Sequence, residues 1–121
     1  MLTVYHYPRC STCKKALKWL EAHGIEATLV DIVSSPPSRQ LLARVLKDSG
    51  LPLQKLFNTS GELYREGNYK QRLAQLSEGD ALEELAEHGK LIKRPIAVGT
   101  VAGKTVALVG FREADYEREF V

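Results

Sequence analysis

The chain has two cysteines, and they are separated by two residues as Cys10-x-x-Cys13. They follow residues 2–7, a run rich in β-branched and aromatic side chains, which predicts a strand. They precede residues 14–24, where apolar positions recur at spacings of three and four and a glycine closes the run, which predicts a helix. A second β-branched run at 27–33 completes a β-α-β order with parallel strands. The cysteine pair therefore lies where a strand passes into a helix.

The later part of the chain is helical first and then β-structured. Helices are predicted at 39–49 and, behind the N-cap residue Ser77, up to Gly89, with shorter helices between them. Two strands and a last short helix are predicted at 95–99, 104–109 and 113–120. Parallel and antiparallel strands together predict an α/β fold, a mixed four-stranded sheet of thioredoxin/glutaredoxin type in the order βαβ … ββα. We expect one domain, residues 1–121, with a helical subdomain inserted at roughly 38–90.

Charge and hydropathy exclude several classes of function. The 17 basic and 15 acidic residues give a net charge of +2, too balanced for a direct nucleic-acid binder. Apolar runs are too short for a membrane-spanning helix, and we expect no membrane association. The first residues carry no basic leader and no long apolar stretch, so we expect a cytoplasmic location. In such a reducing compartment a close cysteine pair is more often redox-active or metal-binding than structural.

The position of the motif predicts a reactive thiolate. Free N–H groups at a helix N-terminus stabilise an anion, and basic residues follow and precede the motif, among them Arg9 and Lys14. Lowering a thiol pKa from about 8.5 to about 7 requires roughly 2 kcal/mol, which the helix terminus and nearby cations can supply together. We assign Cys10 as the attacking sulfur because it precedes the helix. Cys13 opens the apolar face of the helix and is assigned as the resolving thiol.

Other readings of the cysteine pair remain open at this stage. The pair can be two small core residues, a chance CxxC in an unrelated fold, or half of a zinc site. A structural zinc site usually takes four protein ligands, and the chain has no second CxxC and no HxxxH, so we predict no metal. His6, four residues before Cys10 on the predicted strand, either tunes the thiolate or has a structural role.

A second candidate site is the pair Arg94-Pro95, where two cations precede a proline that opens a strand. An X–Pro bond can be cis, and thioredoxin-like folds place a cis-proline opposite the cysteine motif. In that case the planar guanidinium of Arg94 can reach toward Cys10 and bind an oxyanion or a carboxylate. The alternative is a solvated arginine at the start of a strand.

The chain resembles the arsenate reductase-related (ArsC/Spx/YffB) family of bacterial thioredoxin-fold proteins. The resemblance is carried by residues 7–16 (YPRCSTCKKA), 36–39 (PPSR), 56–61 (LFNTSG), 94–96 (RPI) and 108–111 (LVGF). It implies a glutaredoxin-like core with a helical insertion, and it places Cys10 at the family's nucleophilic position. The stretches after Phe57 look most like the YffB branch.

Departures from the family pattern bear on function. Glutaredoxin-coupled arsenate reductases resemble the chain at Cys10 and Arg94, but they place further arginines where this chain has Asn58 and Gly110. They also typically lack a cysteine at the position of Cys13. Both differences argue against arsenate reduction, which would use glutathione and glutaredoxin as partners.

Two branches that keep the CxxC supply the remaining hypotheses. The leading one is a thiol–disulfide oxidoreductase without a bound cofactor, which uses Cys10 and Cys13 on a protein disulfide or on glutathione-linked substrates. The alternative is an Spx-type redox-sensing transcriptional regulator, whose Cys10–Cys13 disulfide alters its contact with the C-terminal domain of the RNA polymerase α-subunit.

Overall fold

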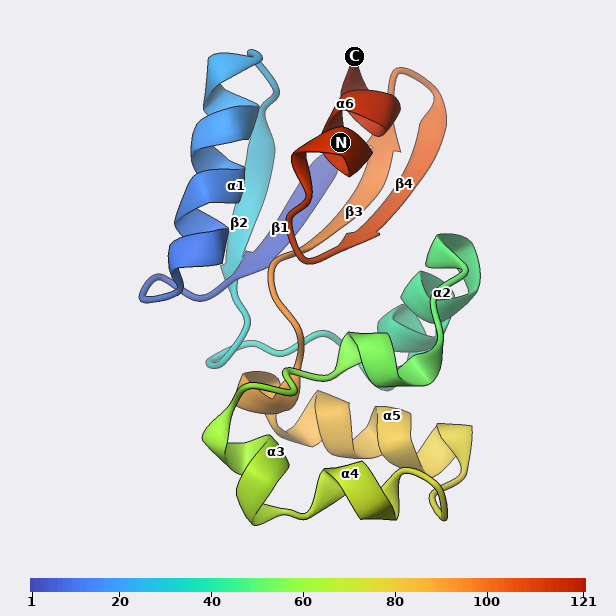
Figure 1. Cartoon of the computed structure of the whole chain (residues 1–121). Helices are drawn as coiled ribbons and strands as arrows, with labels where there is room; N and C mark the ends of the chain where they lie inside the picture. The colour runs from blue at the N-terminus through green and yellow to red at the C-terminus, as the bar shows by residue number, and fades with distance from the viewer.

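A four-stranded mixed sheet forms one half of the molecule, as Figure 1 shows. The computed structural model describes all residues, 1–121. Strand β1 (Leu2–His6) pairs in parallel with β2 (Ala27–Asp31) and antiparallel with β3 (Ile96–Val101). Strand β4 (Lys104–Val109) pairs antiparallel with β3, giving the order β2-β1-β3-β4. The predicted α/β class and mixed sheet are confirmed.

Helices α1 (Ser11–Ala22) and α6 (Glu113–Phe120) cover one face of the sheet. Their apolar side chains form one core with alternate residues of the strands, and Trp19 and Tyr116 contact each other edge to face within it. Helix α1 begins three residues earlier than predicted, because the Lys14 N–H donates to the carbonyl of Cys10 and closes the first turn there. Cys13 therefore lies inside the first turn.

The β3–β4 hairpin is tighter than predicted. Its turn consists of Ala102 and Gly103, both with positive φ, the backbone form that matches the twist of a two-residue hairpin. Thr100 and Val101 consequently extend β3 instead of belonging to the turn.

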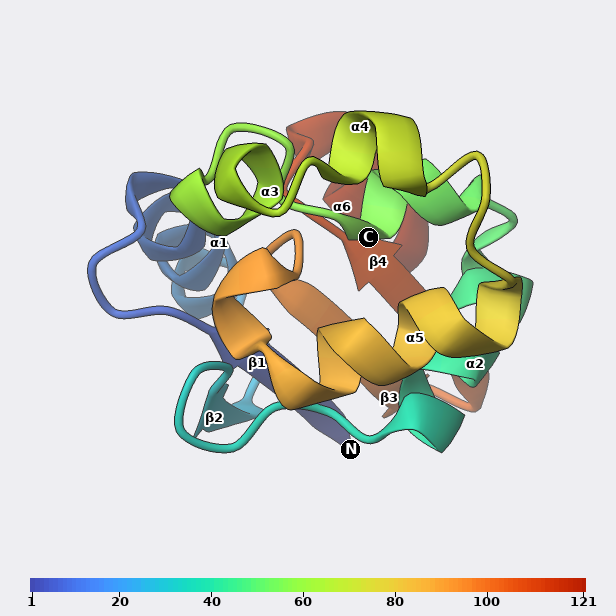
Figure 2. The same ribbon diagram turned by 90° about the horizontal axis from the view of Figure 1, so that it is seen from below.

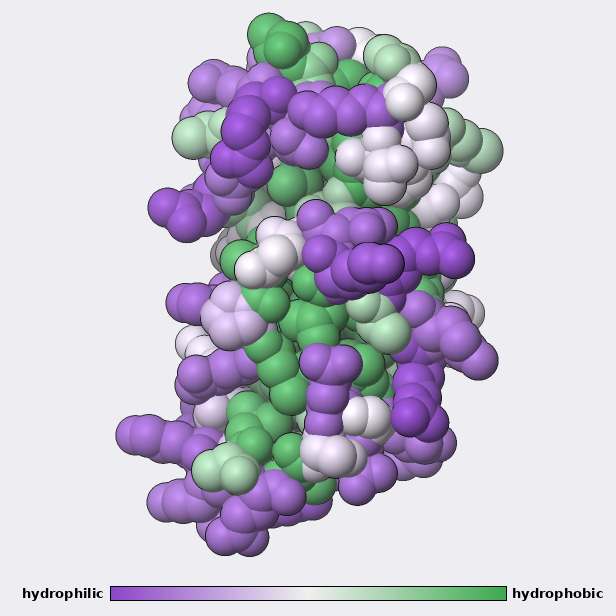
Figure 3. All heavy atoms as spheres, turned by 90° about the vertical axis from the view of Figure 1, so that its right-hand side faces the viewer, coloured by the Kyte–Doolittle hydropathy of each residue, from purple (hydrophilic) through white to green (hydrophobic).

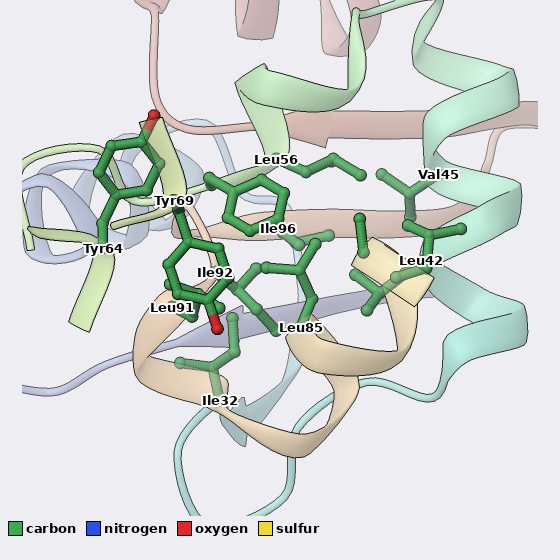
Figure 4. Packing of buried hydrophobic residues seen from close by; sticks show 13 residues of the cluster. Ile32, Leu42, Val45, Leu56, Tyr64, Tyr69, Leu85, Leu91, Ile92 and Ile96 are labelled. Carbon is green, nitrogen blue, oxygen red and sulfur yellow. The ribbon is translucent and has the colours of Figure 1, made fainter. Parts of the chain in front are cut away.

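The segment between β2 and β3 is helical and lies at one end of the sheet (Figures 1 and 2). It contains six short elements, α2 (Arg39–Ser49), η1 (Leu53–Leu56), α3 (Glu62–Glu66), α4 (Tyr69–Arg72), α5 (Glu78–Glu87) and η2 (Gly89–Leu91). A second core of 13 buried residues holds these elements together (Figure 4). Ile32 and Ile96 belong to it and come from the segments that flank the helical part, so this core continues into the sheet. No helix in the structure has both the length and the apolarity needed to cross a membrane.

Two serine caps start the longer helices of this segment. The Ser38 hydroxyl accepts a hydrogen bond from the Leu41 N–H, and the Ser77 hydroxyl accepts one from the Asp80 N–H, both at 3.1 Å. Each satisfies a helix N–H that has no partner within the helix.

We expect Ser77→Ala to lower the free energy of unfolding by about 1 kcal/mol, because the Asp80 N–H loses its acceptor. Urea unfolding followed by circular dichroism measures this change. Ser35→Ala is the control, since the exposed Ser35 side chain makes no hydrogen bond. Equal stability of the two variants would contradict a capping role for Ser77.

Candidate active site

Cys10 is the N-cap residue of α1 and is half-buried at the end of the β1–α1 connection. Its N–H donates to the carbonyl of Tyr7 at 2.9 Å, which closes a turn and fixes the backbone before the helix. The two cysteines are both free thiols. This arrangement leaves the Cys10 sulfur at the helix N-terminus, where unpaired N–H groups converge.

Burial works against a thiolate at Cys10, but hydrogen bonds outweigh it. Burial raises the pKa of the Cys10 thiol, whereas hydrogen bonds from the Cys13 backbone and side chain, the Arg94 side chain and the Thr12 backbone lower it. The net pKa lies below the ordinary value of 9.0. Cys10 is therefore the more nucleophilic of the two sulfurs at neutral pH.

Cys13 has the opposite character. Its side chain is 1% exposed, and its sulfur accepts a hydrogen bond from the Tyr7 N–H at 3.5 Å. Burial, followed by the hydrogen bond to Cys10 and the negative charge of that group, raises the pKa of Cys13 to about 12. Cys13 thus stays protonated while Cys10 is a thiolate, and the two pKa values are separated by the fold around them.

Arg94 lies just before β3, the strand next to β1 in the sheet, and it approaches Cys10 from there. The peptide bond between Arg94 and Pro95 is cis, directly before β3. An isolated antiparallel bridge between Phe57 and Ile92 ties this stretch to the helical segment. The guanidinium donates to the Lys90 carbonyl at 3.1 Å, and it lies close enough to the Cys10 thiol to lower its pKa. The helical segment thereby helps to position Arg94.

Tyr7 contacts each of the main groups of the site and was not identified from the sequence. Its backbone contacts both cysteines, and its ring lies 5.0 Å from the Arg94 guanidinium carbon in a cation–π arrangement. The only sequence signal is an aromatic residue before the proline that precedes the motif. That signal does not reveal a contact with a residue nearly ninety positions away.

Three of the predicted residues do not join this cluster. Arg9 and Lys14 are exposed and make no ion pair or side-chain hydrogen bond. The principal causes of the Cys10 pKa shift are burial, Cys13, Arg94 and Thr12, so neighbouring lysines are not what stabilises the thiolate. His6 is half-buried, its side chain makes no hydrogen bond, and its backbone carbonyl accepts a hydrogen bond from the Ile32 N–H at 2.8 Å.

The position of Gly110 lies close to the site but carries no side chain. Its N–H donates to the Pro95 carbonyl at 2.8 Å, and a methyl group added at Gly110 would approach the Lys93 side chain at 3.2 Å. An ammonium-bearing side chain therefore passes over this position. No group of three or more His, Cys, Asp or Glu side chains with the geometry of a metal site occurs in the chain.

The arrangement is suited to thiol–disulfide exchange. An accessible thiolate, a buried protonated thiol in contact with it, and a guanidinium beside both are the groups that this chemistry requires. The guanidinium can also bind an anionic group of a substrate.

The chain is similar in sequence to several known proteins. The family model described as "ArsC family" matches residues 5–119. YusI of Bacillus subtilis (strain 168) is 49% identical over 98% of this chain and 98% of its own length. An arsenate reductase of Escherichia coli is 29% identical over 85% of this chain and 72% of its own. The regulatory protein MgsR of Bacillus subtilis is 31% identical over 80% and 75% of the two chains.

Solved structures show the same fold. A possible arsenate reductase from Streptococcus mutans UA159 superposes with a TM-score of 0.87 at 43% identity, covering 99% of this chain and 98% of that one. A protein described as YFFB (PA3664) superposes with a TM-score of 0.81 at 29% identity over the whole of both chains.

Proposed function

The chain belongs to the ArsC family, and from that premise we propose that it is a thiol–disulfide oxidoreductase working through Cys10 and Cys13. The observation that carries the proposal is the separation of the two pKa values, one lowered at the helix N-cap and one raised to about 12 in the interior. A nucleophile that is ionised and a resolving thiol that is not can act in sequence without competing.

The proposed reaction transfers two electrons from the cysteine pair to a disulfide. The Cys10 thiolate attacks one substrate sulfur, forms a mixed disulfide and releases the other sulfur as a thiolate. Cys13 then attacks the Cys10 sulfur, its proton passes to the departing substrate thiolate, and a Cys10–Cys13 disulfide results. Formation of the mixed disulfide removes the Cys10 charge that helps to raise the pKa of Cys13, so the second thiol becomes easier to ionise at the step that needs it.

Glutathione is the proposed reductant in the reducing cytoplasm. Two molecules of glutathione return two electrons to the Cys10–Cys13 disulfide and leave as oxidised glutathione. Arg94, which is half-buried and beside the nucleophile, can bind a glutathione carboxylate. The test is reduction of a small symmetric disulfide by purified protein with glutathione, glutathione reductase and NADPH. Absence of any rate above that of glutathione alone would refute the proposal.

Arg94 is expected to stabilise the thiolate form of Cys10. We expect Arg94→Ala to raise the pKa of Cys10, because one of the hydrogen bonds that lower it is lost, and to slow disulfide reduction at pH 7 by about tenfold. The rate should recover as the pH approaches 9, where the ordinary thiol ionises. Arg94→Lys keeps the charge without the planar fork and should fall between the two proteins.

The pH dependence of iodoacetamide alkylation at Cys10 measures this effect directly. Equal alkylation profiles for Arg94→Ala and the unmodified chain would show that Arg94 has no influence on the thiolate.

Arsenate is expected to be a poor substrate, because the positions where related arsenate reductases carry further arginines hold Asn58 and Gly110. Only Arg94 supplies a guanidinium beside Cys10. In the coupled assay with glutathione and glutaredoxin, arsenate should add no consumption of NADPH to that seen without it. A substantial arsenate-dependent rate would identify the protein as an arsenate reductase instead.

The similarity to the regulatory protein MgsR supports a second candidate, a redox-sensing transcriptional regulator. In that function the Cys10–Cys13 disulfide changes a protein-contact surface and does not turn over substrate. The test is capture of the C-terminal domain of the RNA polymerase α-subunit by the oxidised and the reduced chain. Redox-dependent capture without disulfide reductase turnover would favour the regulator.

A further inference from the structure

The outer edge of β4 carries unpaired backbone groups. β4 is the last strand in the sheet order and has a neighbour on one side only. The Gly110 N–H donates to the Pro95 carbonyl, and hydrogen-bonding direction alternates from residue to residue along an antiparallel strand. The residues whose N–H and C=O groups point away from β3 are therefore Thr105, Ala107 and Val109.

A hydrogen bond on the other side of β3 agrees with this assignment. Thr100 lies opposite Thr105, but the Thr100 N–H donates to the Met1 carbonyl and is directed toward β1. Open strand edges are commonly protected by charged residues, prolines or bulges. Within β4 only Lys104, at its first position, is charged, and the strand contains no proline. The outward backbone groups of Thr105, Ala107 and Val109 have no hydrogen-bond partner, although α2 packs against β4.

The open edge forms the wall of a groove that reaches the cysteine motif. A hollow of about 570 Å³ is lined by β4 from Thr105 to Val109, by the end of α2, by α6 and by Thr12. Thr12 is one of the two residues between the cysteines, so one end of the groove lies next to the motif, although neither cysteine lines it. Figure 3 looks onto the side of the molecule that carries β4 and α2, where apolar surface runs between polar side chains.

The charges in the groove are arranged asymmetrically. Lys55, Lys93 and Arg112 line it together with Thr12, and none of the three is in an ion pair. Two acidic residues of α6 line the groove, and the first of them, Asp115, pairs with Arg118 at 3.1 Å.

Glu119 pairs with Lys104 at 3.1 Å, at the hairpin end of the groove. The remaining carboxylate, Asp48, also lines the neighbouring hollow between α2 and the sheet. Unneutralised positive charge therefore collects beside the cysteine motif, and this favours a negatively charged group on whatever binds there.

We propose that an extended segment of a protein substrate adds to β4 as a fifth strand, with its disulfide-bonded cysteine beyond Val109 and an acidic residue next to that cysteine. Backbone hydrogen bonds to Thr105, Ala107 and Val109 supply the affinity, and the lysines and Arg112 select the acidic side chain. The proposal rests on the proposed reductase function and names its substrate class, an acidic peptide disulfide in extended conformation.

The first test uses the unmodified protein and synthetic peptides. A seven-residue peptide has a glutamate next to a cysteine that is disulfide-bonded to a small thiol. Two further versions carry N-methyl groups at alternate backbone positions, either the odd or the even ones. Only one of these sets faces β4, so one version should show a KM about tenfold higher while the other stays close to the parent peptide.

Replacing the glutamate of this peptide by lysine should also raise KM about tenfold. A small symmetric disulfide serves as the internal standard. If it is reduced while both N-methylated peptides behave like the parent, strand addition is refuted and the proposed function stands.

A matched pair of proline variants tests the same edge from the protein side. Ala107→Pro removes an N–H that faces outward without removing a bond to β3. Leu29→Pro is the control on the opposite edge strand, because the Ile32 N–H donates to His6 and the same alternation directs the Leu29 N–H away from β1. The KM for the peptide should rise about tenfold in Ala107→Pro and stay unchanged in Leu29→Pro.

Equal KM values in these two variants would overturn the proposal. Circular dichroism and thermal unfolding of both variants show whether the sheet is intact, and the N-methylated peptides test the edge without any variant.

Amide hydrogen exchange tests the docking without turnover. Adding the reduced peptide to the Cys10→Ser variant should slow exchange at Thr105, Ala107 and Val109 at least about tenfold, with little change along β2. This result stands even if the protein proves not to be a reductase. Protection of the three amides without peptide, together with a dimer in sedimentation, would show that a second copy of the chain covers the edge and would overturn the proposal.

Discussion

Cys10→Ser is expected to slow disulfide reduction by more than about a thousandfold, because the hydroxyl that replaces the thiol is not ionised near neutral pH. The hydrogen bonds from Cys13, Arg94 and Thr12 that lower the pKa of Cys10 have no anion to stabilise in this variant. The measurement is glutathione-dependent reduction of a small disulfide with NADPH as readout. Equal rates for the variant and the unmodified chain would remove Cys10 from the mechanism.

Cys13→Ser is the matched control, and it should fail at a different step. The Cys10 thiolate still attacks, but no second protein sulfur can resolve the mixed disulfide, so a covalent adduct with the substrate accumulates when glutathione is left out. Mass spectrometry under non-reducing conditions detects this adduct and should find none with Cys10→Ser. Adducts on Cys13 in the Cys10→Ser variant would reverse the assignment of the two sulfurs.

Alkylation distinguishes the two thiols in the unmodified chain. Because burial raises the pKa of Cys13 to about 12, its thiol is protonated at pH 7, and its side chain is 1% exposed. Cys10 has a pKa below 9.0 and is half-buried. Iodoacetamide should therefore modify one cysteine per folded chain, with a rate whose midpoint in pH lies below 9.0, and two per chain in denaturant.

Gly89→Ala is expected to destabilise the fold by about 3 kcal/mol. Gly89 is buried in η2, and a methyl group there would lie 1.9 Å from the Ile32 carbonyl oxygen and 2.9 Å from the Val33 Cα. Both are backbone atoms that follow β2, so the clash is relieved only if the helical segment shifts away from the sheet. The same shift would move Lys90, whose carbonyl accepts a hydrogen bond from Arg94.

Gly79→Ala is the comparison for this variant. A methyl group at Gly79, within α5, would meet only the Arg39 guanidinium at 2.7 Å, the mobile end of an exposed side chain. Loss of the exposed Arg39–Glu83 ion pair costs little, and alanine favours the helix, so we expect a gain of about 0.5 kcal/mol.

Urea unfolding of both glycine variants gives the comparison. A cost below about 1 kcal/mol for Gly89→Ala would show that the contact with Ile32 is not tight.

Periodicity and turn residues located most of the elements, because they depend on neighbours in the chain. Alternation and apolar spacing predicted β1, α1 and β2, and Ser77 was recognised as a residue that can start a helix. Errors occurred where a local hydrogen bond or an unusual dihedral decided the boundary. The early start of α1 depends on the Lys14–Cys10 bond, and the extent of β3 depends on the positive φ of Ala102.

The candidate site was only partly predictable. Cys10 and Cys13 share one short motif, so their proximity follows from the sequence. Tyr7 was missed, and Arg9 and Lys14 were expected to stabilise a thiolate although both are exposed to solvent. Proximity along the chain was a poor guide to which cations lie near the sulfur. Arg9 and Lys14, close to the motif, are exposed, whereas Arg94, far away in the sequence, lies beside Cys10.

Residues close together along the chain were enough to predict the strand–helix junction at the cysteines, the order of the elements and the family. The burial that raises the pKa of Cys13, the contacts of Tyr7 and the course of the groove along β4 became known only from the folded structure. These properties depend on burial and on contacts between segments far apart in sequence, such as Tyr7 with Arg94 and Thr12 with the groove along β4. Burial and hydrogen bonding depend on which atoms are neighbours in the folded chain, and the order of residues in the sequence gives little information about that.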